Sequence, residues 1–314
     1  MRRIVTTAGF TAALLAASSW VGTTAANAST AGTSRDVSDH ISITVRTDAS
    51  GRDHVTGGLR HHAGHYVIRY VNANRHGSDV VLVQLRGNAT LAELVQKIQQ
   101  QNAGGPQGPT PAQLRAAAAS TRWLNLHVRA YGGAGFEQPG QAWNTETLPA
   151  GRYLFLDVNK IFAHQTGYLV GVLDVHGRLD ADDTTLPRSS GSVTMVKGDR
   201  FRVSGALDAD GNILIRNRSD SIHMVEFTPV RPGTTDAQMT ALFAAEASGK
   251  PPAADPTDHS RPGVLEDVLT PGRSVVFHTN ALKPGLYDLE CFVADDMTGM
   301  PHAFMGMHKV VVLH

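Results

Sequence analysis

Short apolar runs separated by turn-forming residues recur along the chain from about residue 40 to its end. Three of them are HYVIRYV at 65–71, RYLFLDV at 152–158 and LYDLECFV at 286–293, and Gly, Pro, Asn or Asp stands close to most run ends. Runs of this length, rich in β-branched and aromatic residues, indicate β-strands. Because they do not alternate with helical patterns, the sequence predicts an all-β sandwich and not a βαβ fold.

Two capping boxes mark the only helices that we predict. Thr90 is followed three residues later by Glu93, and Thr235 by Gln238. In a capping box the threonine side chain accepts a hydrogen bond from the third helical amide, while the Glu or Gln side chain bonds back to the amide of the threonine. We therefore expect one short helix after each threonine.

The order of these features occurs twice, which predicts an internal duplication. The two capping threonines are separated in sequence by the same distance as Asn72 and Asn217, each of which follows a strand containing Ile-Arg. Later stretches also correspond, namely 139–155 with 271–289 and 164–175 with 302–313. Small changes in the offset indicate loop insertions.

The duplication divides the chain into two predicted domains, at 37–176 and 190–314, joined by a polar linker at 177–189. Each is expected to be a Greek-key β-sandwich with one short helical insertion. The segments that follow the helices, 101–119 and 248–263, are rich in Gly, Pro and Ala. They are expected to be surface excursions.

The N-terminus is typical of a secretory signal peptide. Arg2 and Arg3 precede an apolar run at about 8–21, and Ala26-Asn27-Ala28 follows as a small-x-small cleavage site. We expect cleavage after Ala28 and a secreted or extracytoplasmic protein. The run is too short to span a membrane, and no later segment approaches the roughly 20 apolar residues that a span needs.

Charge and cysteine content narrow the classes of partner. Lys plus Arg equals Asp plus Glu, at 28 each. Without a basic surplus, nucleic acid is not an expected partner. Cys291 is the only cysteine, so an exported chain has no internal disulfide, and the thiol is expected to be buried or bound to a metal.

Strand periodicity places Cys291 among inward-facing residues. In 285–293 the alternation puts Tyr287, Leu289 and Cys291 on one face of a strand, with Asp288 and Glu290 on the other. His223 alternates in the same way with inward-facing Val225 and Phe227. The loop after Cys291 adds histidines and methionines, and thiol, imidazole and thioether groups together suit a soft metal ion.

At these residues the second half of the chain resembles the cupredoxin family of copper-binding Greek-key β-sandwiches. The matching positions are Asn217 and His223 upstream, then Gly285, Tyr287, Cys291, His302, Gly306-Met307 and the final strand KVVVL at 309–313. The resemblance covers most of 190–314. One departure is the loop of ten residues, Phe292 to Pro301, between Cys291 and His302, which is longer than the family usually has.

The resemblance implies one copper ion, held by a thiolate, two imidazoles and an axial thioether. Mapped onto this sequence, Cys291 is the thiolate, His223 and His302 are the imidazoles, and Met307 is the axial ligand. The family implies single-electron transfer with a redox protein partner. The chain would then be two tandem cupredoxin-like domains.

The first half lacks this ligand pattern. By the same counting, Asp157 stands in place of the cysteine, Ser78 in place of the first histidine, and Tyr168 or Leu169 in place of the methionine, while only His164 is retained. The first domain is therefore expected to hold no metal.

Three functions remain open, and none is enzymatic. The chain has no His-x-His pair, and Glu290 stands immediately before Cys291, where copper oxidases and nitrite reductases are expected to have histidine. Besides electron transfer, one alternative is a metal-free β-sandwich binding module. The other is copper storage or delivery to an exchange partner through a loop that is rich in Met and His, namely Met297, Met300, Met305 and Met307 beside His302 and His308.

Overall fold

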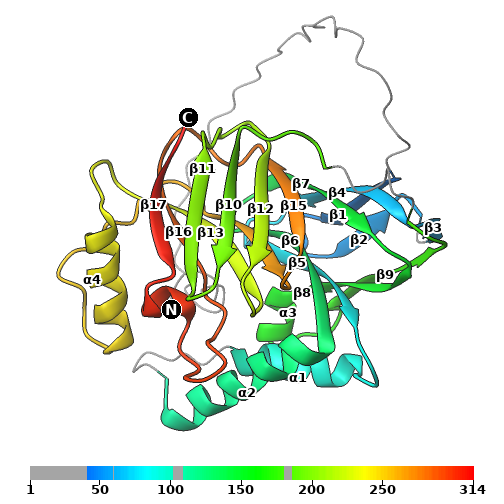
Figure 1. Ribbon diagram of the computed structural model, residues 1–314, viewed down its shortest axis with the longest axis horizontal. Helices are drawn as coiled ribbons and strands as arrows, with labels where there is room; N and C mark the ends of the chain where they lie inside the picture. Colours follow the sequence, from blue (N-terminus) through cyan, green and yellow to red (C-terminus); the bar gives the residue numbers. More distant parts are fainter. Residues whose placement is uncertain (1–40, 59, 102–108, 180–185) are drawn as a thin grey trace, which may run out of the picture.

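The computed structural model describes residues 41–314 except 59, 102–108 and 180–185. The predicted signal peptide, the first residues of predicted domain one and the middle of the predicted linker lie outside these residues. The chain forms two large β-sheets, with α1 and α2 gathered at one end and α4 beside β17 (Figure 1). In the described part of the chain, none of the helices has the length and hydrophobicity that a transmembrane span requires.

Many strands coincide with predicted apolar runs, for example those at 64–72, 151–157 and 285–290, whereas the glycine-rich strand at 128–136 corresponds to no predicted run. The strands before residue 177 are β1 (Ile41–Thr47), β2 (Asp53–Thr56), β3 (Arg60–His62), β4 (Gly64–Asn72), β5 (Ser78–Leu85), β6 (Val128–Phe136), β7 (Gly140–Leu148), β8 (Gly151–Asp157) and β9 (Leu169–His176). Those after it are β10 (Gly191–Val196), β11 (Arg200–Gly205), β12 (Ile213–Arg218), β13 (His223–Pro229), β14 (Val264–Leu269), β15 (Ser274–Thr279), β16 (Gly285–Glu290) and β17 (His308–Leu313).

Both sheets contain strands from both halves of the chain. The eight-stranded sheet has the order β11-β10-β12-β15-β7-β4-β1-β2, and the nine-stranded sheet has the order β17-β16-β13-β14-β6-β5-β8-β9-β3. The halves join through two antiparallel pairs, β15 with β7 and β14 with β6. The predicted all-β class is confirmed, although the sheets run without a break across the predicted linker.

Strand pairing has the same pattern in the two halves. In the first sheet, β1 pairs antiparallel with β2 and parallel with β4, as β10 does with β11 and β12. In the second, β5 lies between β6 and β8, as β13 lies between β14 and β16.

One hydrophobic core fills the space between the sheets and runs through both halves. Phe227 on β13 and Phe277 on β15 stack across it, with ring centroids 6.1 Å apart. A smaller cluster beneath α4 brings Met239 and Phe243 against Leu286 and Val310 on β16 and β17. That cluster covers the outer side of these two strands.

Both faces of β16 are buried, because α4 and its apolar cluster cover the outer one. Asp288 and Glu290 point away from the side of Tyr287 and Leu289, as the alternation predicts, yet both are fully buried. Alternation within a strand separates its two faces, but it does not say whether a second layer covers the outer one.

The helices are more numerous than predicted. They are α1 (Leu91–Gln101), α2 (Pro111–His127), α3 (Val158–Phe162), α4 (Asp236–Ala247) and the 3-10 turn η2 (His302–Met305). The capping boxes that begin α1 and α4 are confirmed.

The prediction that 101–119 is a surface excursion is wrong for its second part, where the helix α2, 17 residues long, begins. Its start signal was present in the sequence. Thr110 and Gln113 form a third capping box, and Pro111 occupies the first turn, which proline tolerates. The preceding run of Gly and Pro concealed this signal, and the alanine-rich helix has little amphipathic pattern.

Candidate metal centre

Three of the four predicted ligands meet at one end of the sandwich. His223 begins β13, Cys291 directly follows β16, and His302 begins η2. The Sγ atom of Cys291 lies 3.6 Å from Nδ1 of His223 and 3.6 Å from Nδ1 of His302. The three side chains are 0%, 0% and 1% exposed, in the order His223, Cys291, His302. Long-range folding therefore assembles a closed group of two imidazoles and a thiol.

These distances fit a single metal ion between the three atoms. Bonds of about 2.3 Å to sulfur and about 2.0–2.1 Å to nitrogen, separated by angles of about 110–120°, place the two ligand atoms about 3.6–3.8 Å apart. The two imidazole rings have centroids 4.6 Å apart and are inclined by 53°. The cluster is compatible with one copper ion, as predicted.

The side chain of Asn217 holds the turn that precedes His223. Its Nδ2 donates to the carbonyls of Ser221, at 2.8 Å, and Leu269, at 2.7 Å, while its Oδ1 accepts from the amide of Ser219 at 2.9 Å. The buried carboxamide thus holds the turn that leads into β13. This gives a structural role to the asparagine that the sequence pairs with His223.

The Cys–His loop, residues 292–301, closes on itself despite its length. Asp295 accepts hydrogen bonds from the amides of Met297, at 3.1 Å, and Thr298, at 2.6 Å. The amide of His302 donates to Val293 O at 3.0 Å, and that of Ala303 donates to Cys291 O at 2.7 Å. The extra residues form a hairpin-like excursion, so that His302 returns to Cys291. Asp295 therefore shapes the loop by turn hydrogen bonds.

Helices α1 and α2, from the first half of the chain, hold this loop in place. Thr121 on α2 donates to the carbonyl of Ala294 at 2.7 Å, and Gln101 at the end of α1 accepts from the Ala294 amide at 3.1 Å. Arg122 donates to the carbonyl of Asp296. At Gly299, φ is 75°, and an added Cβ would lie 1.9 Å from the carbonyl oxygen of Leu114. The missed helix α2 is thus part of the support of the candidate site.

Met307, the predicted axial ligand, is fully buried. Its amide donates to the carbonyl of His302 at 2.9 Å, and Gly306 before it has a left-handed φ of 103° that ends η2. Met307 shares the main core with Cys291. Its backbone therefore ties it to the site, while the role of its sulfur stays a prediction.

Burial sets the protonation of the cluster. It lowers the pKa of His223 from 6.5 to about 3, with the neighbouring His302 adding to the effect, and it also lowers the pKa of His302. Burial raises the pKa of the Cys291 thiol to about 12, although hydrogen bonds from the backbone of Met224 and Val293 oppose that rise. Both imidazoles are therefore neutral at neutral pH, which is the form that binds metals, and metal binding would displace the thiol proton.

Asp199 stands over the outer nitrogens of both imidazoles. Its Oδ1 lies 3.7 Å from Nε2 of His223 and 3.9 Å from Nε2 of His302. It follows β10 with a φ of 51°, an uncommon value for a residue other than glycine. Sequence reasoning missed Asp199, because it comes from a different hairpin and belongs to no pattern with the ligands.

The equivalent positions of the first half hold another kind of cluster. Ser78 begins β5, and Asp157 ends β8, where its side chain caps α3 and lies 3.0 Å from Nζ of Lys160. Lys160 also pairs with Asp53 on β2. His164 makes a 3.0 Å contact with Gln99 of α1. An ion-paired lysine thus lies where the second half has the thiol cluster.

The comparisons with known proteins return copper proteins of low similarity. No protein-family model and no curated protein matches the chain. Auracyanin A, a blue copper protein from Chloroflexus aurantiacus, is 18% identical, matches 44% of this chain and 100% of its own, and has a TM-score of 0.31.

Two larger neighbours match more of the chain. A multicopper oxidase is 12% identical over 87% of this chain and 88% of its own, with a TM-score of 0.21. A copper-containing nitrite reductase from Thermus scotoductus is 10% identical over 88% of this chain and 68% of its own, with a TM-score of 0.22. The predicted resemblance to cupredoxins is confirmed by the two-sheet fold and by the group of His223, Cys291 and His302.

Proposed function

We propose that the protein is an exported copper protein whose second half holds one copper ion and passes single electrons to a redox partner protein. The observation that carries this proposal is the spacing of the three buried ligand atoms, with Cys291 Sγ 3.6 Å from both Nδ1 atoms. Copper, when bound, supplies one-electron chemistry by changing between Cu(I) and Cu(II). A set of thiolate, two imidazoles and thioether suits both states.

The residues around the site would keep this geometry constant. Asn217 holds the turn before His223, and the Cys–His loop is anchored on α1 and α2. A rigid set of ligands reduces the structural change that accompanies electron transfer. The Asp199 carboxylate lies 3.7 Å and 3.9 Å from the outer nitrogens of the two imidazoles, beyond hydrogen-bond distance, where its negative charge would favour a proton on those nitrogens.

The remaining parts of the proposal rest on the sequence and on strand pairing. The signal-like segment 1–28 supports export. The repeated pairing pattern supports two tandem cupredoxin-like domains, at 37–176 and 190–314. Glu290 in the place of a histidine supports a role other than copper-dependent catalysis.

Visible spectroscopy tests the copper site directly. Cu(II) added to the purified protein should give intense thiolate-to-copper absorption at one equivalent, and Cys291→Ser should abolish it. His302→Ala should alter or remove the band. His164→Ala, at the corresponding position of the first half, is the matched control and should leave it unchanged. A colourless protein that retains no copper would contradict the proposal and leave a metal-free binding module.

Copper delivery is the second candidate, and the exposure of two methionines favours it. Met297 is 79% exposed and Met305 is 48% exposed, both close in sequence to His302. Exposed thioethers suit transient Cu(I) contacts. Replacing both by leucine should slow Cu(I) transfer to a chelator if delivery is the function, and should leave the rate unchanged if the protein only transfers electrons.

A further inference from the structure

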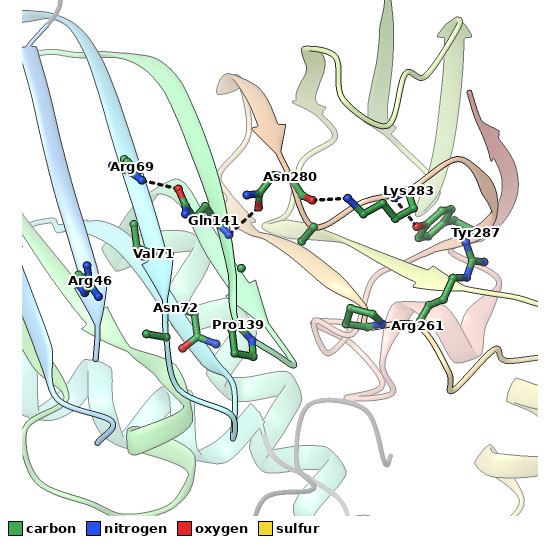
Figure 2. A pocket seen from close by; sticks show the side chains of 14 residues that line it. Arg46, Arg69, Val71, Asn72, Pro139, Gln141, Arg261, Asn280, Lys283 and Tyr287 are labelled. Atoms are coloured by element: carbon green, nitrogen blue, oxygen red, sulfur yellow. Dashed lines mark hydrogen bonds between the residues drawn. The ribbon is translucent and has the colours of Figure 1, made fainter. Parts of the chain in front are cut away.

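A cleft of about 640 Å³ lies where the two halves of the eight-stranded sheet meet, and the charged residues that line it are all positive. Its charged lining residues are Arg46, Arg69, Arg261 and Lys283 (Figure 2). Among the described residues, no Asp or Glu lines it. The whole chain has a formal net charge of zero, so this local excess of positive charge is not a consequence of a basic composition.

The first half supplies two arginines on neighbouring strands. Arg46 lies on β1, and Arg69 lies on β4, where it donates to the side chain of Gln141 at 2.5 Å. The guanidinium of Arg69 also lies 5.6 Å from the ring centroid of Trp143. Within the described part of the chain, neither arginine forms an ion pair with a carboxylate. Both side chains are exposed, so a ligand can reach them from solvent.

The second half supplies Arg261 and Lys283, and Tyr287 organises both. The guanidinium of Arg261 lies 4.9 Å from the Tyr287 ring centroid and is held by Asp258 at 2.8 Å. The hydroxyl of Tyr287 accepts from the amide of Lys283 at 3.1 Å. Gly285, the glycine of the Gly-x-Tyr pattern, makes room for Arg261, because an added Cβ would lie 2.7 Å from its Nη1.

Amide groups connect the two sides of the cleft. Gln141 on β7 and Asn280 after β15 exchange hydrogen bonds, with the Gln141 amide donating to Asn280 Oδ1 at 3.1 Å and the Asn280 amide donating to Gln141 O at 3.2 Å. Figure 2 shows this pair between Arg69 on one side and Lys283 on the other. The spacing of the charges is therefore set by the joined sheet.

We propose that this cleft binds a small polyanion carrying two or more phosphate or carboxylate groups. Guanidinium groups match both oxyanions through paired hydrogen bonds, and hydrogen bonds between charged partners are stronger than neutral ones. Arg261 is already paired with Asp258, but Arg69 and Lys283 lie on opposite sides of the amide pair. A ligand with separated negative groups can therefore reach both of them, which a single small anion cannot. The volume is in the range of small-molecule sites, roughly 300–1,000 Å³.

The cleft is separate from the candidate metal centre. Tyr287 precedes Cys291 by four residues along β16 and its end, which is about 13 Å at the rise of an extended strand. A polyanion in the cleft would therefore not touch the thiol. This inference does not depend on whether copper binds.

Calorimetric titration with inorganic tripolyphosphate and, separately, with citrate tests the inference. We expect saturable binding of at least one probe at low ionic strength, with about a tenfold loss of affinity in Arg69→Ala and in Lys283→Ala. Binding of tripolyphosphate alone would assign a phosphate ligand, and binding of citrate alone a carboxylate ligand. The double variant should lose both, and its melting temperature should stay near that of the wild type, because both side chains are exposed.

Arg202→Ala is the matched control, since Arg202 is an exposed strand arginine on β11 and outside the cleft. It should bind the probes with unchanged affinity. An equal loss in Arg202→Ala would show unspecific attraction and overturn the inference, as would the absence of binding at millimolar probe. Quenching of Trp143 on titration, lost in Arg69→Ala, gives a second readout of the same contact.

Discussion

Replacing Thr121 by valine tests whether a helix of the first half holds the candidate metal centre of the second. The Thr121 hydroxyl is buried, donates to the Ala294 carbonyl at 2.7 Å and accepts from Gln101 Nε2 at 2.9 Å. Valine has nearly the same shape but cannot make either bond. The Ala294 carbonyl, which lies in the Cys–His loop three residues after Cys291, would lose this partner.

The magnitude follows from the loss of a buried hydrogen bond. An unsatisfied buried group costs about 1–3 kcal/mol. For a chain of this size, each kcal/mol lowers the melting temperature by about 2–4 °C, so Thr121→Val should melt several degrees below the wild type. The weakened loop leads to His302, so copper should also dissociate faster. The rate should rise by up to about tenfold for each 1.4 kcal/mol by which the copper-bound state is destabilised.

Ser120→Ala is the control for this experiment. Ser120 is also buried on α2 and, like Thr121, it accepts a hydrogen bond from Gln101 Nε2, at 3.0 Å. Its hydroxyl donates to the carbonyl of Lys97 on α1 at 2.6 Å, so Ser120→Ala loses the contact with Gln101 but no direct hydrogen bond to the Cys–His loop. Thermal melting and the rate of copper loss to a chelator are measured for both variants. We expect both variants to melt earlier and only Thr121→Val to lose copper faster. Equal copper loss in the two variants, or none in either, would refute the role assigned to α2.

Three further predictions concern buried titratable groups. The pKa of His223 falls from 6.5 to about 3 on folding, so the unfolded chain takes up the proton at a higher pH than the folded chain does. The free energy of unfolding of the copper-free protein should therefore fall by about 1.4 kcal/mol per pH unit as pH drops from 6.5 towards 3. Denaturant titrations at several pH values should show a weaker dependence of this free energy on pH in His223→Gln. Burial raises the pKa of Cys291 to about 12, so iodoacetamide at pH 8 should leave the native copper-free thiol largely unmodified and should react once urea unfolds the chain. Burial also raises the pKa of Glu146 from 4.5 to about 8, so this residue lowers the free energy of unfolding increasingly as pH rises between these values. Glu146→Gln should therefore raise the melting temperature at pH 9 but not at pH 4. An unchanged melting temperature at pH 9 would contradict this.

The resemblance to cupredoxins implies the ligand set, whereas strand alternation gives only the inward direction of two of its members. Cys291 was placed inward by the alternation of a single strand, and His223 by the alternation of another. Neither pattern gives a distance between them. Their meeting within 3.6 Å depends on the pairing of β13 with β16, which is a long-range property.

The length of the Cys–His loop shows the same limit. Counting ten residues between Cys291 and His302 suggests a wider separation than the family usually has. The hydrogen bonds of Asp295 fold those residues into a closed turn, and contacts with α2 hold the turn in place. The count measures chain length, whereas the separation of the ligands depends on how the loop folds.

Local patterns in the sequence predict many of the strands, the helices after Thr90 and Thr235, the inward direction of Cys291 and the types of ligand offered, because each depends on residues only a few positions apart. Four features appear only in the folded chain: the continuous sheets of both halves, the support of the Cys–His loop by α2, the position of Asp199 near both imidazoles, and the basic cleft. Each of these unites segments that are distant in sequence. Their contacts depend on how whole layers pack, which no local pattern of residue types encodes.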